Sequence, residues 1–176
     1  MPGHPTPSQT IGPYFGIALP FADGGDPAPA GHPAALTLHG AVYDAEGAPV
    51  PDALLEFWQA APDGSRSGAP GSLRRDGVTF TGFARVPTDD NGRYRLRTLA
   101  PGGPPYLALC LFARGLPEHL FTRVYLAVPP GDPLLAALPP ERRGTLLATA
   151  QADGSHHFDL RLGGPAETVF LSFRPE

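Results

Sequence analysis

The sequence predicts an all-β protein, an antiparallel β-sandwich with an extended N-terminal arm and long loops. One observation is that about eight short segments have strand character and are separated by turn-forming residues. A second is the abundance of glycine and proline, at 22 and 24 of the 176 residues, which is typical of a chain with many turns. Because 41% of the residues are hydrophobic, the chain can still bury a sizeable core in one domain.

Residues 1–33 form the predicted arm, and residues 34–176 form the predicted sandwich domain. The arm is rich in proline, glycine, alanine and threonine, but residues 9–15 carry two aromatic residues and an isoleucine. A solvated tail has little reason to carry such side chains. We therefore expect the arm to dock on a partner, and a disordered tail is the alternative.

The first strand is expected at residues 36–43, where apolar residues alternate with small or polar ones. Further strands are expected at residues 53–60, 78–86, 93–99, 106–112, 120–127, 156–162 and 167–173. Residues 89–92, Asp-Asp-Asn-Gly, predict a hairpin. Residues 106–112 are almost continuously apolar, which is typical of a central strand buried on both faces. We expect a loop at 129–139 and a short helix at 141–150.

Charge and cysteine content argue against several classes of protein. The net charge is −4, and the basic residues form no stripe that would indicate a nucleic-acid partner. The single cysteine, Cys110, excludes an internal disulfide and a cluster of cysteine metal ligands. Its apolar neighbours predict a buried packing thiol. No apolar run is long enough to span a membrane, and no signal peptide is evident, so we expect a cytoplasmic protein.

Few side chains indicate chemistry by themselves. The six histidines are scattered, and the adjacent His156 and His157 should point to opposite faces of a strand, so we expect no metal site. Arg114 ends the apolar strand, and Arg123 lies within the next one. A guanidinium held at a strand end suits a carboxylate ligand. A turn residue that hydrogen-bonds backbone carbonyls is the alternative interpretation of Arg114.

Several motifs, in order, resemble the intradiol ring-cleavage dioxygenase family. These are Gly-Ala-Val-Tyr-Asp at 40–44, Glu-Phe-Trp-Gln-Ala at 56–60, Gly-Phe-Ala-Arg at 82–85 and Thr-Leu-Ala-Pro-Gly at 98–102. Each motif is weak alone, but their order and spacing are specific, and the resemblance runs from about residue 6 to residue 173. Residues 6–14, 111–115, 122–125 and 167–170 further resemble the alpha-type chains of the heteromeric, protocatechuate-cleaving branch of this family.

The resemblance implies that this chain lacks the family's metal site. Catalytic chains of the family bind Fe(III) through two tyrosines and two histidines, donors that suit that ion. The histidine pair falls on Tyr106 and Ala108 in this sequence, one tyrosine falls near Arg66, and the other falls in the shortened loop at residues 103–104. All four ligands are therefore lost, so the resemblance implies no catalytic residue and no metal in this chain. Fe(III) would be bound by a homologous beta subunit, the implied partner.

The resemblance also implies a role in an active site. Thr10, Gly12, Pro13 and Tyr14 would line the substrate pocket, and Arg114 would bind the carboxylate of protocatechuate. The implied reaction is the O2-dependent intradiol cleavage of this 3,4-dihydroxybenzoate to 3-carboxy-cis,cis-muconate. The alternative is a stand-alone intradiol-like β-sandwich binding module without catalysis. A third interpretation, an active homomeric catechol dioxygenase, needs ligands that this sequence lacks.

Overall fold

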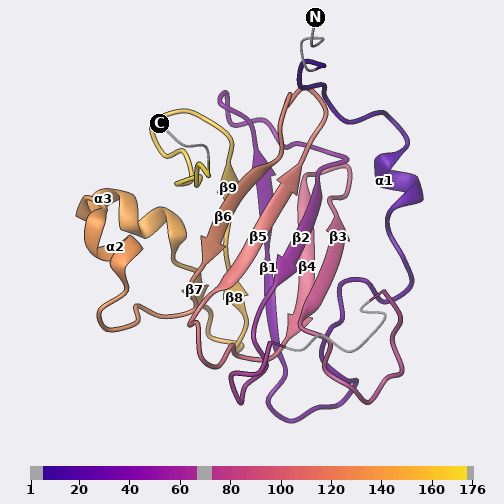
Figure 1. Cartoon of the computed structure of the whole chain (residues 1–176), viewed down its shortest axis with the longest axis vertical. Coiled ribbons are helices and arrows are strands. Elements are labelled where there is room, and N and C mark those ends of the chain that lie inside the picture. Colours follow the sequence, from indigo (N-terminus) through magenta and orange to yellow (C-terminus); the bar gives the residue numbers. More distant parts are fainter. Residues whose placement is uncertain (1–5, 67–72, 174–176) are drawn as a thin grey trace, which may run out of the picture.

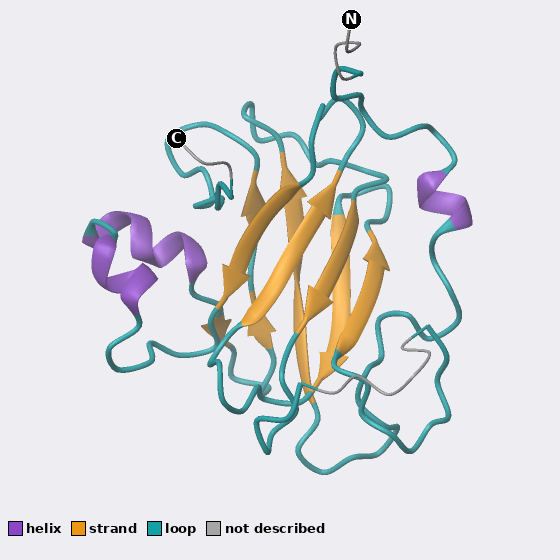
Figure 2. Cartoon of the chain, viewed as in Figure 1, coloured by secondary structure: helices purple, strands orange, loops and turns teal. Residues whose placement is uncertain are grey.

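The computed structural model describes residues 6–66 and 73–173, and it places two β-sheets face to face (Figure 1 and Figure 2). The first sheet has the strand order β4 (Arg93–Thr98), β1 (Leu36–Tyr43), β8 (His156–His157) and β7 (Thr149–Ala150), and β9 (Leu160–Arg161) also pairs with β1. The second has the order β3 (Phe83–Pro87), β2 (Leu54–Trp58), β5 (Leu107–Phe112) and β6 (Leu120–Val124). Except for β8 and β9, which run parallel to β1, the pairings between these strands are antiparallel. The predicted β-sandwich is confirmed.

The core lies between the two sheets. It consists mainly of branched aliphatic and aromatic side chains that alternate along each strand toward the opposite sheet. Those that are almost fully buried include Leu38, Val42, Leu55, Phe57, Leu96, Leu107, Leu109, Leu111, Val124 and Leu160. Each large side chain of this kind stabilises the fold by about 1.5–3 kcal/mol when it leaves water.

Strand β5 is buried on one face only, which corrects the expectation of two buried faces. Leu107, Leu109 and Leu111 point into the core, whereas Ala108 and Cys110 are partly exposed on the outer face. Alanine and cysteine look like core residues in a sequence. The alternation of buried and partly exposed residues along β5 therefore cannot be seen in its composition. Burial and the nearby carboxylate of Glu56 still raise the pKa of the Cys110 thiol to about 12, so the thiol stays protonated at neutral pH.

The predicted turn at residues 89–92 forms, with Gly92 at a φ of 70° and its N–H bonded to the Asp89 carbonyl (2.9 Å). The predicted hairpin is wrong, because the strands on either side of this turn, β3 and β4, do not pair with each other and belong to different sheets. The chain therefore crosses from one layer of the sandwich to the other at this corner.

The third strand begins later than its sequence pattern predicts. We expected residues 78–86, but β3 covers Phe83–Pro87. The Asp76 carboxylate accepts hydrogen bonds from the N–H and hydroxyl of Thr79 (2.7 and 2.6 Å), which folds this stretch into a local turn. Gly82 then adopts a φ of 66°, which an extended strand does not allow.

The helical segments also differ from expectation. Residues 129–139 contain a short helix, α2 (Pro133–Ala137), whose N-terminus is capped by Asp132 (Oδ1 to Leu135 N, 3.0 Å). An aspartate followed by proline is a known helix-start pattern that the sequence reading missed. The helix expected at 141–150 forms only in part, as α3 (Pro140–Arg143) and a 3-10 turn, η1 (Gly144–Leu146). Residues 167–173 form only an isolated bridge, between Leu171 and Phe121.

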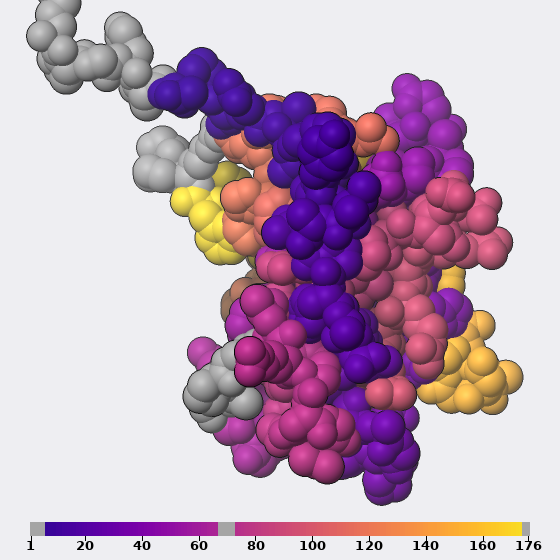
Figure 3. Space-filling model, turned by 90° about the vertical axis from the view of Figure 1, so that its right-hand side faces the viewer, coloured from indigo at the N-terminus to yellow at the C-terminus, as the bar shows by residue number. Residues whose placement is uncertain are grey.

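The N-terminal arm runs along one edge of the sandwich, where its indigo surface crosses from top to bottom in Figure 3. Residues 23–28, which we call the strap, connect the two sheets there. Arg85 N–H of β3 donates to the Gly24 carbonyl (3.0 Å), and Arg97 N–H of β4 donates to the Gly25 carbonyl (2.8 Å). The Ala28 N–H also bonds the Arg97 carbonyl (3.3 Å). The strap therefore satisfies edge groups that would otherwise be open to pairing with another chain.

Residues 6–19, which we call the distal arm, lie beyond the strap and include the short helix α1 (Phe15–Ala18). Phe15 is buried, but its neighbours are largely exposed. In the part of the chain that the structure describes, none of the helices has the length and hydropathy needed to span a bilayer.

Candidate functional site

Arg114 lies in a tight turn at the start of the loop that joins β5 to β6. The Leu116 N–H bonds the Ala113 carbonyl (3.3 Å), and Gly115 adopts a φ of 92°, a value that favours glycine. Because β5 ends at Phe112, the turn projects the Arg114 side chain past the end of the second sheet, where its side chain is 55% exposed.

The distal arm reaches this same turn. The hydroxyl oxygen of Thr10 accepts a hydrogen bond from the Gly115 N–H (2.8 Å). Two of the predicted site residues, Thr10 and Arg114, are therefore brought to one corner of the molecule although 104 positions separate them in the sequence (114 minus 10). A second contact, between the Ser8 hydroxyl and Glu118 (2.9 Å), holds the arm beside the same loop.

The other predicted arm residues continue from this contact without a bond to the Arg114 turn. Gly12 and Pro13 are exposed, and Tyr14 is 75% exposed at the start of α1. Ile17 is 78% exposed on the same short helix. Exposed apolar side chains this close together are typical of a surface that contacts another molecule.

Asp52, which no sequence pattern indicated, lies at the same corner of the molecule as Arg114 and Thr10. Asp52 accepts a hydrogen bond from Arg114 (Oδ2 to Nη2, 2.8 Å). Its side chain is 57% exposed, and its backbone φ of 60° is unusual for a residue other than glycine. Among the described residues no backbone carbonyl accepts from Arg114, so the alternative interpretation of Arg114 as a carbonyl-binding turn residue has no support.

A groove of about 750 Å³ opens beside the corner, between the distal arm and the start of β6. It is lined by Ser8 and Gln9, by residues 117–121 and by residues 171–173. Its wall is aromatic, because the ring of His119 meets that of Phe121 edge-on at 4.6 Å. The groove adds apolar contact area next to the polar Arg114 corner.

Two of the positions matched to the family's metal ligands, Tyr106 and Ala108, do not provide a ligand set for Fe(III). Ala108 has no donor atom, and its register partner across β5 and β6 is Arg123. The Arg123 guanidinium lies 4.1 Å from the centre of the Tyr106 ring, and donates to the Tyr125 hydroxyl (3.2 Å). A guanidinium, which is a cation and no metal ligand, therefore lies beside both of these positions.

The surroundings of Arg123 favour its charge. Partial burial opposes the charge, but the Tyr125 hydroxyl, the Tyr106 ring and the Asp132 carboxylate outweigh it and raise the pKa of Arg123. Across residues 6–66 and 73–173, the structure brings together no group of three or more histidine, cysteine, aspartate or glutamate side chains that could hold a metal ion.

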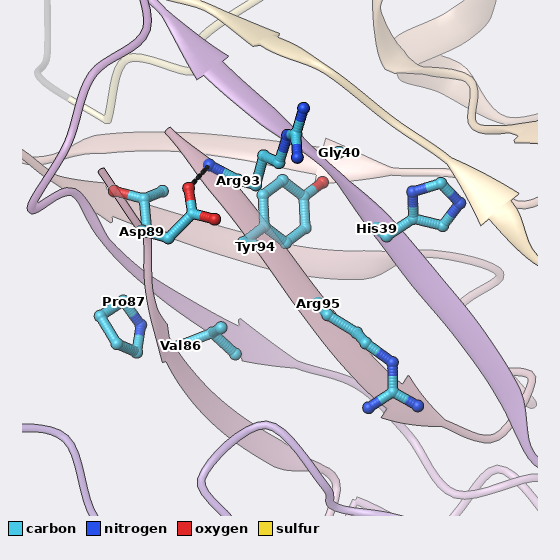
Figure 4. Close-up of a pocket in the computed structure, with 9 residues that line it drawn as sticks. His39, Gly40, Val86, Pro87, Asp89, Arg93, Tyr94 and Arg95 are labelled. Carbon is cyan, nitrogen blue, oxygen red and sulfur yellow. Dashed lines mark hydrogen bonds between the residues drawn. The ribbon is translucent and has the colours of Figure 1, made fainter. Parts of the chain in front are cut away.

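Another hollow, of about 610 Å³, lies between β1 and β4 of the first sheet and the end of β3 of the second, and is shown in Figure 4. Its labelled lining includes His39 on β1 and Arg93 and Arg95 on β4. The Asp89 carboxylate at its rim is already bonded to the backbone N–H of Arg93 (2.8 Å). His39 also approaches His157, with ring centres 5.3 Å apart. This hollow contains none of the predicted site residues.

Comparison with known proteins places the chain in a family. A family model described as a dioxygenase matches residues 12–108. The chain is 37% identical to the protocatechuate 3,4-dioxygenase alpha chain of Burkholderia cepacia, with 94% of this chain and 96% of that relative covered. The chain belongs to the intradiol dioxygenase family. Its membership confirms the resemblance seen in the sequence motifs.

Two further matches show how this family member relates to others. The protocatechuate 3,4-dioxygenase beta chain of Burkholderia cepacia is 34% identical, but over only 57% of this chain and 47% of its own length. Among solved structures, the dioxygenase domain of a carbohydrate-binding fusion protein from Streptomyces sp. SirexAA-E superposes with a TM-score of 0.59 and 28% identity, covering 92% of this chain and 99% of that one. The nearly full-length match to an alpha chain supports the subunit interpretation over a stand-alone binding module.

Proposed function

We propose that this chain is the non-metal-binding alpha subunit of a heteromeric protocatechuate 3,4-dioxygenase. Its partner is a homologous beta subunit, and the complex cleaves 3,4-dihydroxybenzoate with O2 to 3-carboxy-cis,cis-muconate in the cytoplasm. The observation that carries the proposal is the similarity to an alpha chain over 94% of this sequence, against partial similarity to the beta chain. The Arg123 cation beside Ala108 supports the assignment of Fe(III) to the partner.

The two subunits divide the work in this proposal. Fe(III) on the beta subunit supplies the activation of the catechol toward O2. This chain supplies groups that bind and orient the substrate and keep water out of the pocket. None of its side chains needs to change oxidation state.

Arg114 is the proposed contact for the substrate carboxylate. Its planar fork matches a carboxylate in two parallel hydrogen bonds. Within the described residues, its Nη2 is bonded to Asp52, while Nε and Nη1 have no hydrogen-bond partner. The side chain is half-exposed, so a ligand can reach it.

The distal arm is the proposed wall of the pocket and the proposed contact with the beta subunit. Thr10 fixes the arm beside the Arg114 turn, and Gly12 and Pro13 continue the wall from there. Tyr14 and Ile17 present apolar side chains that a partner surface would cover. Burial of such side chains on binding stabilises a complex and dries the pocket.

The proposal is tested by expressing the chain alone, the beta chain alone, and the two together. We expect the chain alone to contain no iron and to consume no O2 with protocatechuate. The joint complex should contain iron, absorb visible light and produce 3-carboxy-cis,cis-muconate. Iron and turnover in the chain alone would contradict the assignment of the metal to the partner. Failure of the two chains to associate would favour the binding-module alternative.

A further inference from the structure

The ion pair between Arg114 and Asp52 is unusual in its placement. Both side chains are more than half exposed, and a surface ion pair of this kind contributes little to stability. The pair nevertheless joins two turns that the sequence separates by 62 positions. It also engages Nη2 of the guanidinium that is proposed to bind substrate.

The position of the Asp52 carboxylate is set by the scaffold. The next residue, Ala53, is locked to Thr88 by hydrogen bonds from its N–H to the hydroxyl and from the Thr88 N–H to its carbonyl, both 2.8 Å. Asp52 itself adopts a φ of 60°, which aspartate in a turn tolerates better than most residues, so the turn fixes where its carboxylate lies. Gly16 of α1 lies above it, since a Cβ at Gly16 would be 4.0 Å from the Asp52 Cβ.

We infer that Asp52 is a specificity-determining residue whose carboxylate holds Arg114 until the carboxylate of the substrate displaces it. The inference rests on the proposed function, in which Arg114 contacts that substrate carboxylate. The exchange replaces one carboxylate with another, so the guanidinium is never left unpaired when a partner covers the corner. An unpaired, desolvated charge would be costly.

The exchange predicts the direction in which Asp52 changes the affinity for a carboxylated ligand. Asp52 competes with the ligand for one guanidinium and places a negative charge beside the incoming carboxylate. Asp52 therefore weakens the binding of a carboxylated ligand. A ring without a carboxylate leaves the ion pair in place, and its binding does not depend on Asp52.

Two variants separate the carboxylate from the backbone conformation. Asp52→Asn keeps the size and a hydrogen-bond acceptor, and asparagine tolerates a positive φ. Asp52→Gly removes the side chain without strain at a φ of 60°. Glu141→Gln is the matched control, because it removes the same charge from exposed α3, on the opposite side of the sandwich from α1 (Figure 1).

The experiment measures steady-state kinetics of the complex formed with the beta subunit. We expect both Asp52 variants to lower the KM for protocatechuate by about 2–5-fold, the scale of an exposed ion pair, without a matching change in kcat. The inhibition constant of catechol, the same ring without the carboxylate, should stay constant. Glu141→Gln should change neither value. In an Arg114→Gln background, Asp52→Asn should lose its effect on KM.

The outcomes separate this inference from the proposed function. If Arg114→Gln raises KM but the Asp52 variants leave it unchanged or raise it, the inference is overturned and the proposed function stands. An equal effect of Glu141→Gln, or an equal shift for catechol, would also overturn it, because the cause would be general charge. If Arg114→Gln leaves KM unchanged, the proposed role of Arg114 fails, and the inference fails with it.

Discussion

The strap and the distal arm are consecutive parts of one N-terminal segment, but they are attached to the sandwich in different ways. The strap at residues 23–28 bonds to both sheets through its main chain and is held further by Arg75, whose Nη2 donates to the carbonyls of Gly24 and Phe83 (3.3 and 2.6 Å). The distal arm contacts the body through the hydroxyl groups of Ser8 and Thr10, the buried ring of Phe15 and the Leu19 carbonyl, which accepts from Arg85 (3.0 Å). It leaves the side chains of Tyr14 and Ile17 exposed.

This difference teaches that composition does not reveal which part of an arm is structural. Both parts are rich in glycine, proline and alanine. The strap fills edge groups of β3 and β4, whereas the distal arm leaves the apolar side chains of Tyr14 and Ile17 exposed. The predicted domain boundary at residue 33 remains a prediction, and the contacts place the change in role near residue 20.

Two truncations should give the largest difference in stability between loss of the strap and loss of the distal arm. Removing residues 1–28 deletes the strap and opens the edge strands, and we expect a loss of about 4 kcal/mol in the free energy of unfolding, at about 1 kcal/mol for each of several hydrogen bonds. Removing residues 1–19 should lower the melting temperature less, because it deletes the Phe15 packing but none of the strap hydrogen bonds, and it should abolish complex formation. Thermal unfolding followed by circular dichroism gives the first comparison. Equal destabilisation by both truncations would contradict the division.

A pair of glycine substitutions tests the same division without deletion. At Gly24 an added Cβ would lie 2.6 Å from the Arg85 carbonyl oxygen, so Gly24→Ala should destabilise the fold by about 1–3 kcal/mol. At Gly12 an added Cβ meets nothing within 4 Å, and Gly12→Ala should leave stability unchanged. Denaturant titration of the two variants measures the difference. A similar midpoint for both would show that the strap tolerates displacement.

Removal of the Arg75 side-chain bonds should loosen the strap without changing its sequence. Arg75→Met keeps part of the packing over Phe21, whose ring centre lies 5.1 Å from the guanidinium, but loses the donors to the strap carbonyls. We expect a loss of about 1–2 kcal/mol in the free energy of unfolding. Amide hydrogen exchange should become faster at Arg85 and Arg97. Unchanged protection at these two amides would argue against a role of Arg75 in holding the strap.

The smallest effect is expected in the distal arm. Thr10→Val removes the acceptor for the Gly115 N–H, an exposed hydrogen bond, and should cost less than about 1 kcal/mol. Thr10→Ser is the matched control, because it keeps the hydroxyl. Hydrogen exchange at Gly115 should be faster in the valine variant only. Equal exchange in both variants would mean that the arm does not depend on this contact.

Side-chain patterns allowed much of the fold to be predicted. The first strand was placed at residues 36–43 and is found there, because its alternation reflects one buried face. The strap was not foreseen, since most of its bonds to the sheets are made by its main-chain groups, which leave no side-chain pattern. The start of β3 was misplaced because the turn at Asp76 depends on a local side-chain bond.

The candidate site was predicted in a similar, partial way. Arg114 could be proposed from its place at a strand end and from the resemblance, and the structure puts Thr10 beside its turn. Asp52 could not be proposed, because its pairing with Arg114 depends on how two distant turns meet. The Arg123 cation beside Ala108 was missed for the same reason, as cross-strand register is a property of the folded sheet.

The bonds of the strap to β3 and β4 can form only after the ribosome has synthesised those strands. Its residues emerge early, but one of its docking partners, Arg97, is 69 positions later in the chain than Ala28. At about 5–20 residues per second, the segment waits for several seconds before β4 exists to receive it. During that time the nascent chain has neither a closed edge nor a positioned distal arm. The strap can therefore take its folded position only after β4 has been synthesised.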